Sequence, residues 1–324
     1  MRYRCLVIGL GQIGMGYDLL LSQDRAIFTH CRAFSLHPMF EILGAVDPSA
    51  AMRSVFEEHY GKIAYEDIPS AMKELSPDLV VISSPTDSHC RVVKQVLTHS
   101  KPMAILCEKP LAYELTDAID IVQSCDDVGV KLFVNYHRRS DQGVIEIKKR
   151  ILSGGIAGPI KGNIWYSKGF MHNGSHFVNL MQFWLGSVKK YSIISNGRLW
   201  NDKDPEPDVF IEFDQGSIVF SAAWEESFSH YTAEIISSTG RILYDRGGEL
   251  IQWQATFDDP EFNGYTILKP EPEIIKNGMD RYQYHVAEQL FLMLEGKDAS
   301  LCSGADALET HEAIHEILNS RINE

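Results

Sequence analysis

A glycine-rich loop follows the first apolar stretch of this chain and has the spacing of a dinucleotide-binding loop. Gly9, Gly11 and Gly14 form the pattern Gly-x-Gly-x-x-Gly directly after the apolar residues 3–8. The first glycine of such a loop permits a tight turn, the second lets the backbone approach a pyrophosphate, and the third lets a helix pack closely on the sheet. The N–H groups at the start of that helix would face the phosphates. We therefore expect dinucleotide binding by Gly9, Gly11, Gln12, Ile13 and Gly14.

A carboxylate at the end of the second apolar stretch favours NAD over NADP. Asp47 follows the apolar residues 40–46, and a carboxylate at such a strand end accepts hydrogen bonds from the ribose hydroxyls and repels a 2′-phosphate. Asp47 lies 33 residues after Gly14, whereas about 20 is usual. An insertion over residues 16–28 would explain the excess, with the helix resuming at His30. A plain turn before Pro48 is the alternative reading of Asp47.

Basic and aromatic residues at two strand ends are further candidates for a binding site. Tyr136, Arg138 and Arg139 follow the last apolar stretch of the first half, which is where doubly wound sheets hold their ligands. An arginine there can clamp a carboxylate or a phosphate. Tyr166 and Lys168 end a later strand that is expected to point to the same region. Ordinary surface or interdomain contacts remain the equal alternative.

A zinc motif in the last helix is discounted. His311, Glu312 and His315 fit the pattern His-Glu-x-x-His, which places two imidazoles on one helix face. The apolar residues around them repeat with the period of a packed helix, and no obvious third ligand follows. We expect no metal site.

The elements that position these residues change character near residues 136–139. In the first part, apolar strands at 3–8, 40–46, 79–83, 104–107 and 131–135 are separated by helical patterns at 50–60, 89–99 and 114–126. Unalternated apolar strands separated by helices predict a parallel sheet that is covered on both faces. We expect an α/β Rossmann domain with a doubly wound parallel sheet over residues 1–137.

The second part is dominated by strands. Alternating patterns predict strands at 160–168, 191–195, 209–213, 217–224, 232–237 and 241–244. Helices are predicted at 142–152, 175–185, 281–295 and 304–321. We expect an α+β domain over residues 138–324 with a large, mostly antiparallel open sheet arranged as a meander.

Composition excludes several classes of protein. The 324 residues carry a net charge of −14, which argues against a nucleic-acid partner because such proteins need a basic face. No stretch approaches the roughly 20 apolar residues of a membrane span, and the short apolar run after Arg4 is no signal peptide. The six cysteines are scattered and are expected to be reduced thiols. We expect a cytoplasmic protein.

Two further motifs carry a family resemblance. Residues 81–89, Val-Ile-Ser-Ser-Pro-Thr-Asp-Ser-His, and residues 107–110, Cys-Glu-Lys-Pro, resemble those of the glucose-fructose oxidoreductase / inositol dehydrogenase (Gfo/Idh/MocA) family. With the glycine loop and the later Asn-Gly-Ser-His of residues 173–176, the resemblance covers essentially the whole chain in order. It implies a Rossmann domain, a second domain whose open sheet often mediates oligomerisation, and hydride exchange between NAD(P) and a sugar-like alcohol.

The resemblance assigns roles to the Glu-Lys-Pro residues. In the family this lysine reaches the nicotinamide and the substrate hydroxyl, and the peptide bond after it is often cis. Carried over, Lys109 would hydrogen-bond the reacting oxygen and help to move its proton, and Glu108 would tether the ribose or orient the lysine. Pro85, Thr86 and His89 join the expected cofactor site. A plain surface turn is the alternative.

The chain departs from the family in the second catalytic stretch. Many members carry Asp-x-x-x-His-x-x-Asp, and here His172, His176 and Asn179 occupy that register. Histidine titrates near neutral pH, so His176 can pass a proton to or from a hydroxyl. His172 would take over part of the role of the missing acid, from a loop just before the helix. A purely structural histidine is the alternative for each. Asn173 and Asn179 are expected to position the substrate.

These observations predict an NAD-dependent oxidoreductase acting on a secondary hydroxyl of a sugar, polyol or nucleotide sugar. A redox-assisted glycoside hydrolase that retains its NAD is the first alternative. The second is a non-catalytic dinucleotide-binding or regulatory protein, which the loss of both acids motivates. We expect a homodimer or homotetramer formed through the C-terminal sheet, and no nucleic-acid or membrane partner.

Overall fold

The computed structural model describes residues 2–22 and 26–320, so part of the predicted insertion and Arg321 of the last predicted helix lie outside the described residues. By their contacts the residues form two compact units. The first unit comprises the chain up to Ser140 together with Asp280–His311, and the second comprises Asp141–Met279 together with the chain from Glu312 onward. The predicted domain limits, residues 1–137 and 138–324, stay a prediction. The contacts place residues 280–311 with the first unit.

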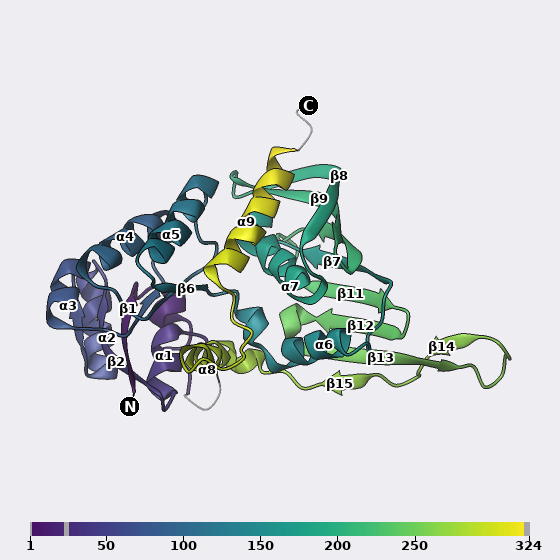
Figure 1. The fold of residues 1–324 in the computed structure, drawn as a ribbon, viewed down its shortest axis with the longest axis horizontal. Coiled ribbons are helices and arrows are strands. Elements are labelled where there is room, and N and C mark those ends of the chain that lie inside the picture. The colour runs from purple at the N-terminus through teal and green to yellow at the C-terminus, as the bar shows by residue number, and fades with distance from the viewer. Residues whose placement is uncertain (1, 23–25, 321–324) are drawn as a thin grey trace. The chain divides into compact units, whose positions relative to one another are not determined.

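The first unit contains a parallel sheet with the strand order β3-β2-β1-β4-β5-β6 (Figure 1). This order reverses direction at β1 and is that of a doubly wound dinucleotide-binding fold, as predicted. The strands are β1 (Tyr3–Ile8), β2 (Phe40–Val46), β3 (Ile63–Tyr65), β4 (Leu79–Ile82), β5 (Ala104–Cys107) and β6 (Lys131–Val134). The short strand β3 was not predicted, because three residues carry too little periodicity.

Helices cover both faces of this sheet. Alternate residues of β1 show why: Leu6 and Ile8 pack in one apolar cluster, whereas Cys5 and Val7 pack in another. The first cluster includes α3, α4 and α5, and the second includes α1, α2 and α8. These helices are α1 (His30–Leu36), α2 (Ala50–Tyr60), α3 (Ile68–Glu74), α4 (His89–His99), α5 (Leu115–Asp127) and α8 (Tyr282–Leu294). Because both faces are buried, the strands are apolar at nearly every position.

The helix expected directly after the glycine loop is a single π-helical turn, η1 (Gln12–Gly16). A regular helix, α1, begins only at His30, after the segment predicted to be an insertion. The helix expected after the loop is therefore limited to this turn, and the contact of its N–H groups with phosphates stays a prediction. After Gly16, residues 17–20 form a turn, and Thr29 caps α1.

The second unit contains a sheet with the strand order β14-β13-β12-β11-β7-β10-β9-β8, and β15 also pairs with β13. The strands are β7 (Ile160–Tyr166), β8 (Val188–Trp200), β9 (Asp204–Phe213), β10 (Gly216–Ala222), β11 (Thr232–Ser237), β12 (Gly240–Asp245), β13 (Leu250–Asp258), β14 (Thr266–Leu268) and β15 (Glu273–Ile275). The helices of this unit are α6 (Gln142–Leu152) and α7 (Ser175–Leu185), and the division between the units falls within α9 (Gly304–Asn319).

The predicted mostly antiparallel sheet is confirmed, but the predicted meander is wrong at its centre. β7 lies between β10 and β11 and pairs in parallel with β10 over Ile160–Tyr166. The helix α7 lies between β7 and β8 in the sequence, so these two strands do not form a hairpin. Parallel neighbours need such a long connection, which local alternation does not reveal.

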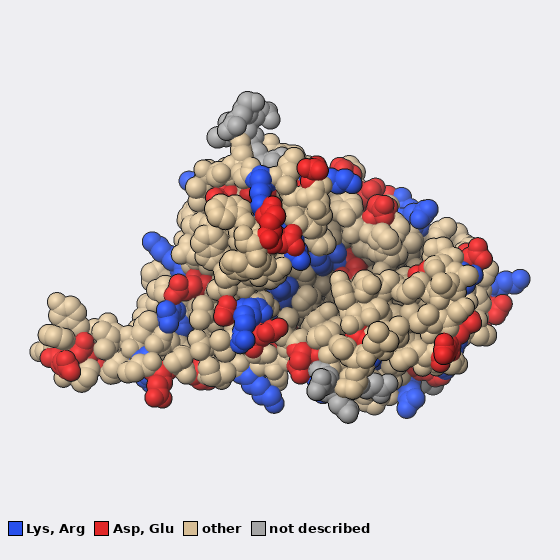
Figure 2. Space-filling model, turned by 180° about the vertical axis from the view of Figure 1, so that it is seen from behind, with Lys and Arg blue, Asp and Glu red and all other residues tan. Residues whose placement is uncertain are grey.

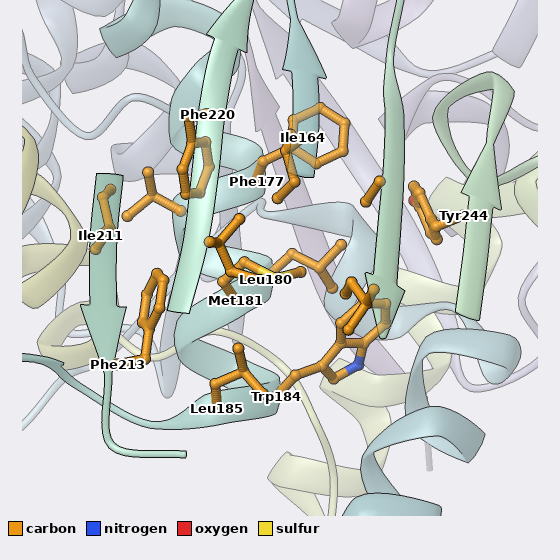
Figure 3. Close-up of a cluster of buried hydrophobic side chains, with 14 of the residues drawn as sticks. Ile164, Phe177, Leu180, Met181, Trp184, Leu185, Ile211, Phe213, Phe220 and Tyr244 are labelled. Carbon is orange, nitrogen blue, oxygen red and sulfur yellow. The ribbon is translucent and has the colours of Figure 1, made fainter. Parts of the chain in front are cut away.

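The core of the second unit lies between one face of this sheet and α7 (Figure 3). Phe177, Leu180, Met181 and Trp184 of α7 point toward strand residues. The strand partners labelled in Figure 3 are Ile164, Ile211, Phe213, Phe220 and Tyr244. Burying a large apolar side chain stabilises the fold by about 1.5–3 kcal/mol, so this face anchors α7 and the residues at its start.

The surface of the described residues is mixed in charge. Figure 2 shows acidic and basic side chains interspersed over the face that it draws. No described helix has the length and apolar character that crossing a membrane would require. All six cysteines are free thiols.

Candidate functional site

The three glycines of the loop after β1 occupy different surroundings. A Cβ on Gly9, whose φ is +96°, would lie 2.6 Å from the backbone nitrogen of Ser84. A Cβ on Gly14 would lie 2.2 Å from the carbonyl oxygen of Gly9. A Cβ on Gly11 would meet no atom of the described chain within 4 Å. Gly9 and Gly14 are therefore required by the fold itself, whereas Gly11 leaves open space beside its backbone.

The loop is held by the strands on both sides of β1. The Gly9 N–H donates to the carbonyl of Val46 at 2.8 Å, and the Ser83 hydroxyl donates to the carbonyl of Gly9 at 2.7 Å. Gln12 is exposed and Ile13 is half-buried on η1. The loop thus presents its backbone at the carboxyl end of β1, where ligands of this fold class lie.

Asp47 contacts the glycine loop directly. Its Oδ2 accepts the Leu10 N–H at 2.8 Å, and its Oδ1 accepts the Ser49 N–H at 2.8 Å. The side chain is half-buried, and each carboxylate oxygen has lone pairs for a further donor. Asp47 therefore contacts the glycine loop as well as the turn that contains Ser49.

The segment after β4 is tied down by a buried histidine. Both ring nitrogens of His89 lie near backbone carbonyls, Nε2 2.9 Å from Ser84 O and Nδ1 3.1 Å from Leu111 O. Burial lowers the pKa of His89. The ring thus contacts the backbone of this segment at Ser84 and the backbone at Leu111. Pro85 is exposed and Thr86 is half-buried.

Glu108 and Lys109 follow β5 at the same edge of the sheet. The Lys109–Pro110 peptide bond is cis, as the resemblance implied. Lys109 is half-buried, and its backbone N–H donates to Glu108 Oε2 at 3.2 Å. Its positive charge also lowers the pKa of His137, after the larger effects of burial and of Arg138. The lysine therefore lies within electrostatic reach of the segment that follows β6.

The Glu108 carboxylate forms hydrogen bonds with two side chains of the first unit. His30 Nε2 lies 2.8 Å from Oε1, and the Asn135 amide donates to Oε1 at 2.6 Å. Burial acts to raise the pKa of Glu108, but the bonds from His30 and Asn135 and the charge of Lys109 outweigh it, so the pKa is lowered. Glu108 is therefore a buried carboxylate that is held in its charged form.

Two of the candidate binding residues after β6 make contacts within the first unit. Tyr136 is buried in the apolar cluster that contains α4 and α5. Arg139 is buried and forms an ion pair with Asp306 at 3.0 Å. The role of Tyr136 as a substrate contact stays a prediction. Arg138 is half-buried and stays a candidate.

In the second unit the residues of the altered motif lie in and after a π-helical turn, η4 (Gly169–Gly174), which runs into α7. His172 is half-buried in η4, and its ring stacks on Trp200 with 5.1 Å between centroids. Asn173 donates its amide to the Tyr231 hydroxyl at 2.9 Å. His176 and Asn179 are buried on α7. His172 precedes the regular helix, as predicted.

Two acids that were not predicted hold this turn. Asp204 accepts the N–H groups of Met171 at 3.0 Å and His172 at 2.7 Å, and Glu206 accepts that of Gly169 at 3.0 Å. Burial raises the pKa of Asp204, although these N–H groups act to lower it. A carboxylate thus does lie beside the position where the family has an acid, but it comes from β9. The alternation of Asp204, Glu206 and Asp208 along one strand was the available signal.

The last two candidates of this unit differ. Tyr166 is fully buried, and its hydroxyl donates to the carbonyl of Pro207 at 2.6 Å. The alternation of β7 turns this side chain toward the core, and its role as a substrate contact stays a prediction. Lys168 is half-buried, has a φ of 68° and forms an ion pair with Glu225 at 3.0 Å.

The zinc motif belongs to α9. His311 is buried, and His315 Nδ1 lies 3.1 Å from the Asn319 amide nitrogen. In residues 2–22 and 26–320, no group of three or more histidine, cysteine or acidic residues is arranged to hold a metal ion.

Comparison with known families decides the class of the first unit. Residues 3–136 match the family model GFO_IDH_MocA, an oxidoreductase family with an NAD-binding Rossmann fold. These residues belong to the Gfo/Idh/MocA oxidoreductase family. The matched range includes the glycine loop, Asp47 and the Glu-Lys-Pro motif. The second unit lies outside the matched residues.

The individual relatives of this chain are distant. Inositol 2-dehydrogenase of Rubrobacter xylanophilus is 32% identical over 110 residues, which cover 34% of this chain and 31% of that protein. D-apiose dehydrogenase of Rhizobium rhizogenes is 23% identical over 292 residues, which cover 80% and 81%. The chain thus spans about a third of the first relative and most of the second.

The fold of the whole chain is shared with solved structures. The WlbA dehydrogenase from Bordetella pertussis, in complex with NADH and UDP-GlcNAcA, superposes with a TM-score of 0.75 at 16% identity. The superposition covers 99% of this chain and 98% of that one. At this identity the likeness establishes the fold.

Proposed function

We propose that this chain is an NAD-dependent dehydrogenase that acts on a secondary hydroxyl of a sugar, polyol or nucleotide sugar. The observation that carries the proposal is the placement of Lys109 after β5, at the edge of the sheet that also bears the glycine loop and Asp47. A half-buried amine beside a dinucleotide site can bind and deprotonate an alcohol. The names of the inositol and apiose dehydrogenases support a polyhydroxylated substrate.

The first unit fits the cofactor. The open space beside Gly11 admits a close approach of a pyrophosphate, and Asp47 keeps lone pairs for the ribose hydroxyls. The same carboxylate would repel a 2′-phosphate, which supports NAD rather than NADP. Gln12, Ile13, Pro85, Thr86 and Glu108 complete the proposed contacts. Bound NAD would supply a hydride acceptor at C4 of its nicotinamide ring.

The proton is assigned to side chains of this chain. In the proposed reaction the Lys109 amine binds the hydroxyl oxygen and accepts its proton as the hydride leaves the carbon. In the second unit His176 is the proposed acid–base partner, and His172 assists it. Asn173 and Asn179 would orient neighbouring hydroxyls, and Arg138 and Lys168 would bind an acidic group on the substrate.

A substrate screen tests this function. The purified protein is mixed with NAD or NADP and a panel of polyols, aldoses, uronic acids and nucleotide sugars, and formation of the reduced cofactor is followed by absorbance. We expect turnover with NAD, and we expect Lys109→Ala to lower kcat by about 10²–10⁴-fold, as removal of a general base does. Lys101→Ala, which removes an exposed lysine of the same unit, is the control.

Four outcomes would contradict the proposal. If Lys109→Ala oxidises the best substrate as fast as the wild type, Lys109 has another role. Faster turnover with NADP would overturn the assignment to Asp47. Product release without net reduction of NAD would indicate the glycoside hydrolase, and NAD binding without any turnover would indicate a non-catalytic protein.

A further inference from the structure

The carboxylate of Glu108 lies in a buried polar cluster that the proposed chemistry does not itself require. The cluster consists of Glu108, His30, Asn135 and Gln283, and Glu108 is 8% exposed while His30 is 1% exposed. Besides its bond to Glu108, the Asn135 amide donates to Gln283 Oε1 at 3.2 Å. Gln283 Nε2 lies 3.2 Å from His30 Nε2. Three polar side chains from separate parts of the chain thus converge around Glu108, the residue that precedes Lys109.

Within the cluster the direction of the central bond is fixed by chemistry. An ionised carboxylate only accepts hydrogen bonds, so His30 Nε2 carries the hydrogen that Glu108 Oε1 accepts. Bonds to a charged group in a buried setting are stronger than neutral ones and are costly to break. The other carboxylate oxygen, Oε2, accepts the backbone N–H of Lys109. His30 and Lys109 therefore bind the two oxygens of one carboxylate.

The segment after the glycine loop is what brings His30 to this place. The buried carboxylate of Asp18 accepts the N–H groups of Phe28 at 2.6 Å and Thr29 at 3.0 Å, and the Thr29 hydroxyl at 2.7 Å. Arg32 donates to the carbonyls of Ala26 at 3.1 Å and Leu21 at 2.9 Å. Asp18 and Arg32 thus fasten both described ends of the insertion, and α1 starts with His30 facing Glu108.

We propose that His30 is a positioning residue, delivered by the insertion after the glycine loop, which holds the Glu108 carboxylate and through it the Lys109 backbone in the geometry that the reaction needs. This inference rests on the proposed function for its consequence, but the link between His30 and Glu108 is testable without turnover. The segment predicted to be an insertion precedes α1, whose first residue is the one that reaches Glu108.

The test uses three variants. His30→Ala removes the donor. His30→Gln keeps an amide N–H at a similar reach and serves as the conservative rescue. His37→Ala is the matched control, because His37 lies at the other end of α1 and makes the same kind of bond, from Nε2 to Glu288 Oε2 at 2.9 Å. If His30→Ala does not fold, His30→Asn, whose amide is too short to reach Glu108, replaces it.

The first readout is the titration of Glu108 in the protein without cofactor, followed by the ¹³C shift of its carboxyl group and assigned by its loss in Glu108→Gln. His30 is the foremost group that lowers the pKa of Glu108 against burial, so its removal should raise that pKa. We expect the midpoint in His30→Ala to lie at least about one pH unit above that of the wild type. His30→Gln and His37→Ala should titrate like the wild type. A purely packing role of His30 would leave the midpoint unchanged.

The second readout is turnover of the best substrate. We expect His30→Ala to lower kcat by about tenfold or more with little change in KM, as loss of orientation at a reacting group does. His30→Gln should recover most of the rate. If the wild type turns over no alcohol, the proposed function fails, while the titration still decides the bond to Glu108. The inference is overturned if the Glu108 midpoint does not move, if kcat is unchanged in an active enzyme, or if His37→Ala has the same effects as His30→Ala.

Discussion

The glycines after β1 differ in whether a side-chain atom would fit at their positions. Gly14 has no room for a side chain, since a Cβ would press on the backbone oxygen of Gly9 at 2.2 Å, and backbone cannot move aside as the end of a side chain can. Gly11 has room within the protein and extended backbone with a φ of −69°, which any residue adopts. The fold of the described chain therefore does not require a glycine here, and the proposed pyrophosphate contact does.

This contrast predicts opposite results for two alanine variants. Gly14→Ala should lower the free energy of unfolding by about 1–3 kcal/mol, as overpacking does. Gly11→Ala should leave it within about 0.5 kcal/mol of the wild type but weaken NAD binding by tenfold or more, about 1.4 kcal/mol. Urea unfolding and calorimetric titration with NAD measure the two effects. Gly11→Ala binding NAD as tightly as the wild type would show that the cofactor does not approach this backbone.

At the scale of elements, the start of α9 shows how a helix is fixed by its first turn. Ser303 and Asp306 bond to each other's backbone: the Asp306 N–H donates to the Ser303 hydroxyl at 3.1 Å, and the Ser303 N–H donates to Asp306 Oδ2 at 2.9 Å. This is a capping box, which satisfies N–H groups that a helix leaves without partners. The same carboxylate binds Arg139, so the helix start is also tied to the segment after β6.

The pH dependence of stability follows from this carboxylate. Burial acts to raise the pKa of Asp306, but Arg139 and Ser303 outweigh it and the pKa is lowered. A carboxyl group with a lowered pKa stabilises the fold above its unfolded pKa of about 3.9, and this stabilisation is lost as the pH falls through the folded value. We expect Asp306→Asn to lower the free energy of unfolding at pH 7 by about 1 kcal/mol, as loss of a cap does.

Urea unfolding at several pH values measures this difference, which should shrink toward zero in the acid range where the wild-type carboxyl group is also protonated. Asp298→Asn, which alters an exposed carboxylate of the same unit, should match the wild type throughout. A difference that stays constant down to acid pH would contradict the electrostatic account.

At the scale of the molecule, helices of the described residues cover one face of the large sheet in the second unit. Strand residues that alternate with the buried ones face the other side, and several are large and apolar. Trp165 on β7 is 47% exposed, Ile236 on β11 is 48% exposed, and Ile194 on β8 is exposed as well. Exposed large apolar side chains on a sheet face are a feature of association sites. We propose that two or four copies of the chain associate through this face.

Substitution at the centre of the sheet tests this association. A charge at Trp165 would have to be buried without a partner in the interface, which is strongly unfavourable. We expect the wild type to have the mass of a dimer or tetramer by light scattering, and Trp165→Glu to be a monomer or to dissociate at least about tenfold more readily. Ile63→Glu, at an exposed position of β3 in the first unit, should leave the mass unchanged. A monomeric wild type would refute the proposal directly.

How far the sequence predicts this molecule depends on the range of the interactions involved. The parallel sheet, the limits of α2, α4, α6 and α7, and the glycine loop follow from patterns of neighbouring residues, because period and turn chemistry are local. The placement of β7 beside β10 does not, because the partner of a strand after a long crossover is chosen by the packing of the whole sheet. Tyr166 illustrates the same limit, since it is fully buried whereas Trp165, one position earlier on β7, is exposed.

The chemistry divides in the same way. The sequence by itself determined that a dinucleotide loop, an acid after β2 and a Glu-Lys-Pro turn occur in the order of one oxidoreductase family, because the residues of each motif are consecutive or nearly so. Only the tertiary structure decided that His30 binds Glu108 across 78 positions and that Asp204 binds the backbone of His172 across 32. A hydrogen bond requires atoms within about 3 Å, and no sequence spacing specifies which distant residues the fold brings that close.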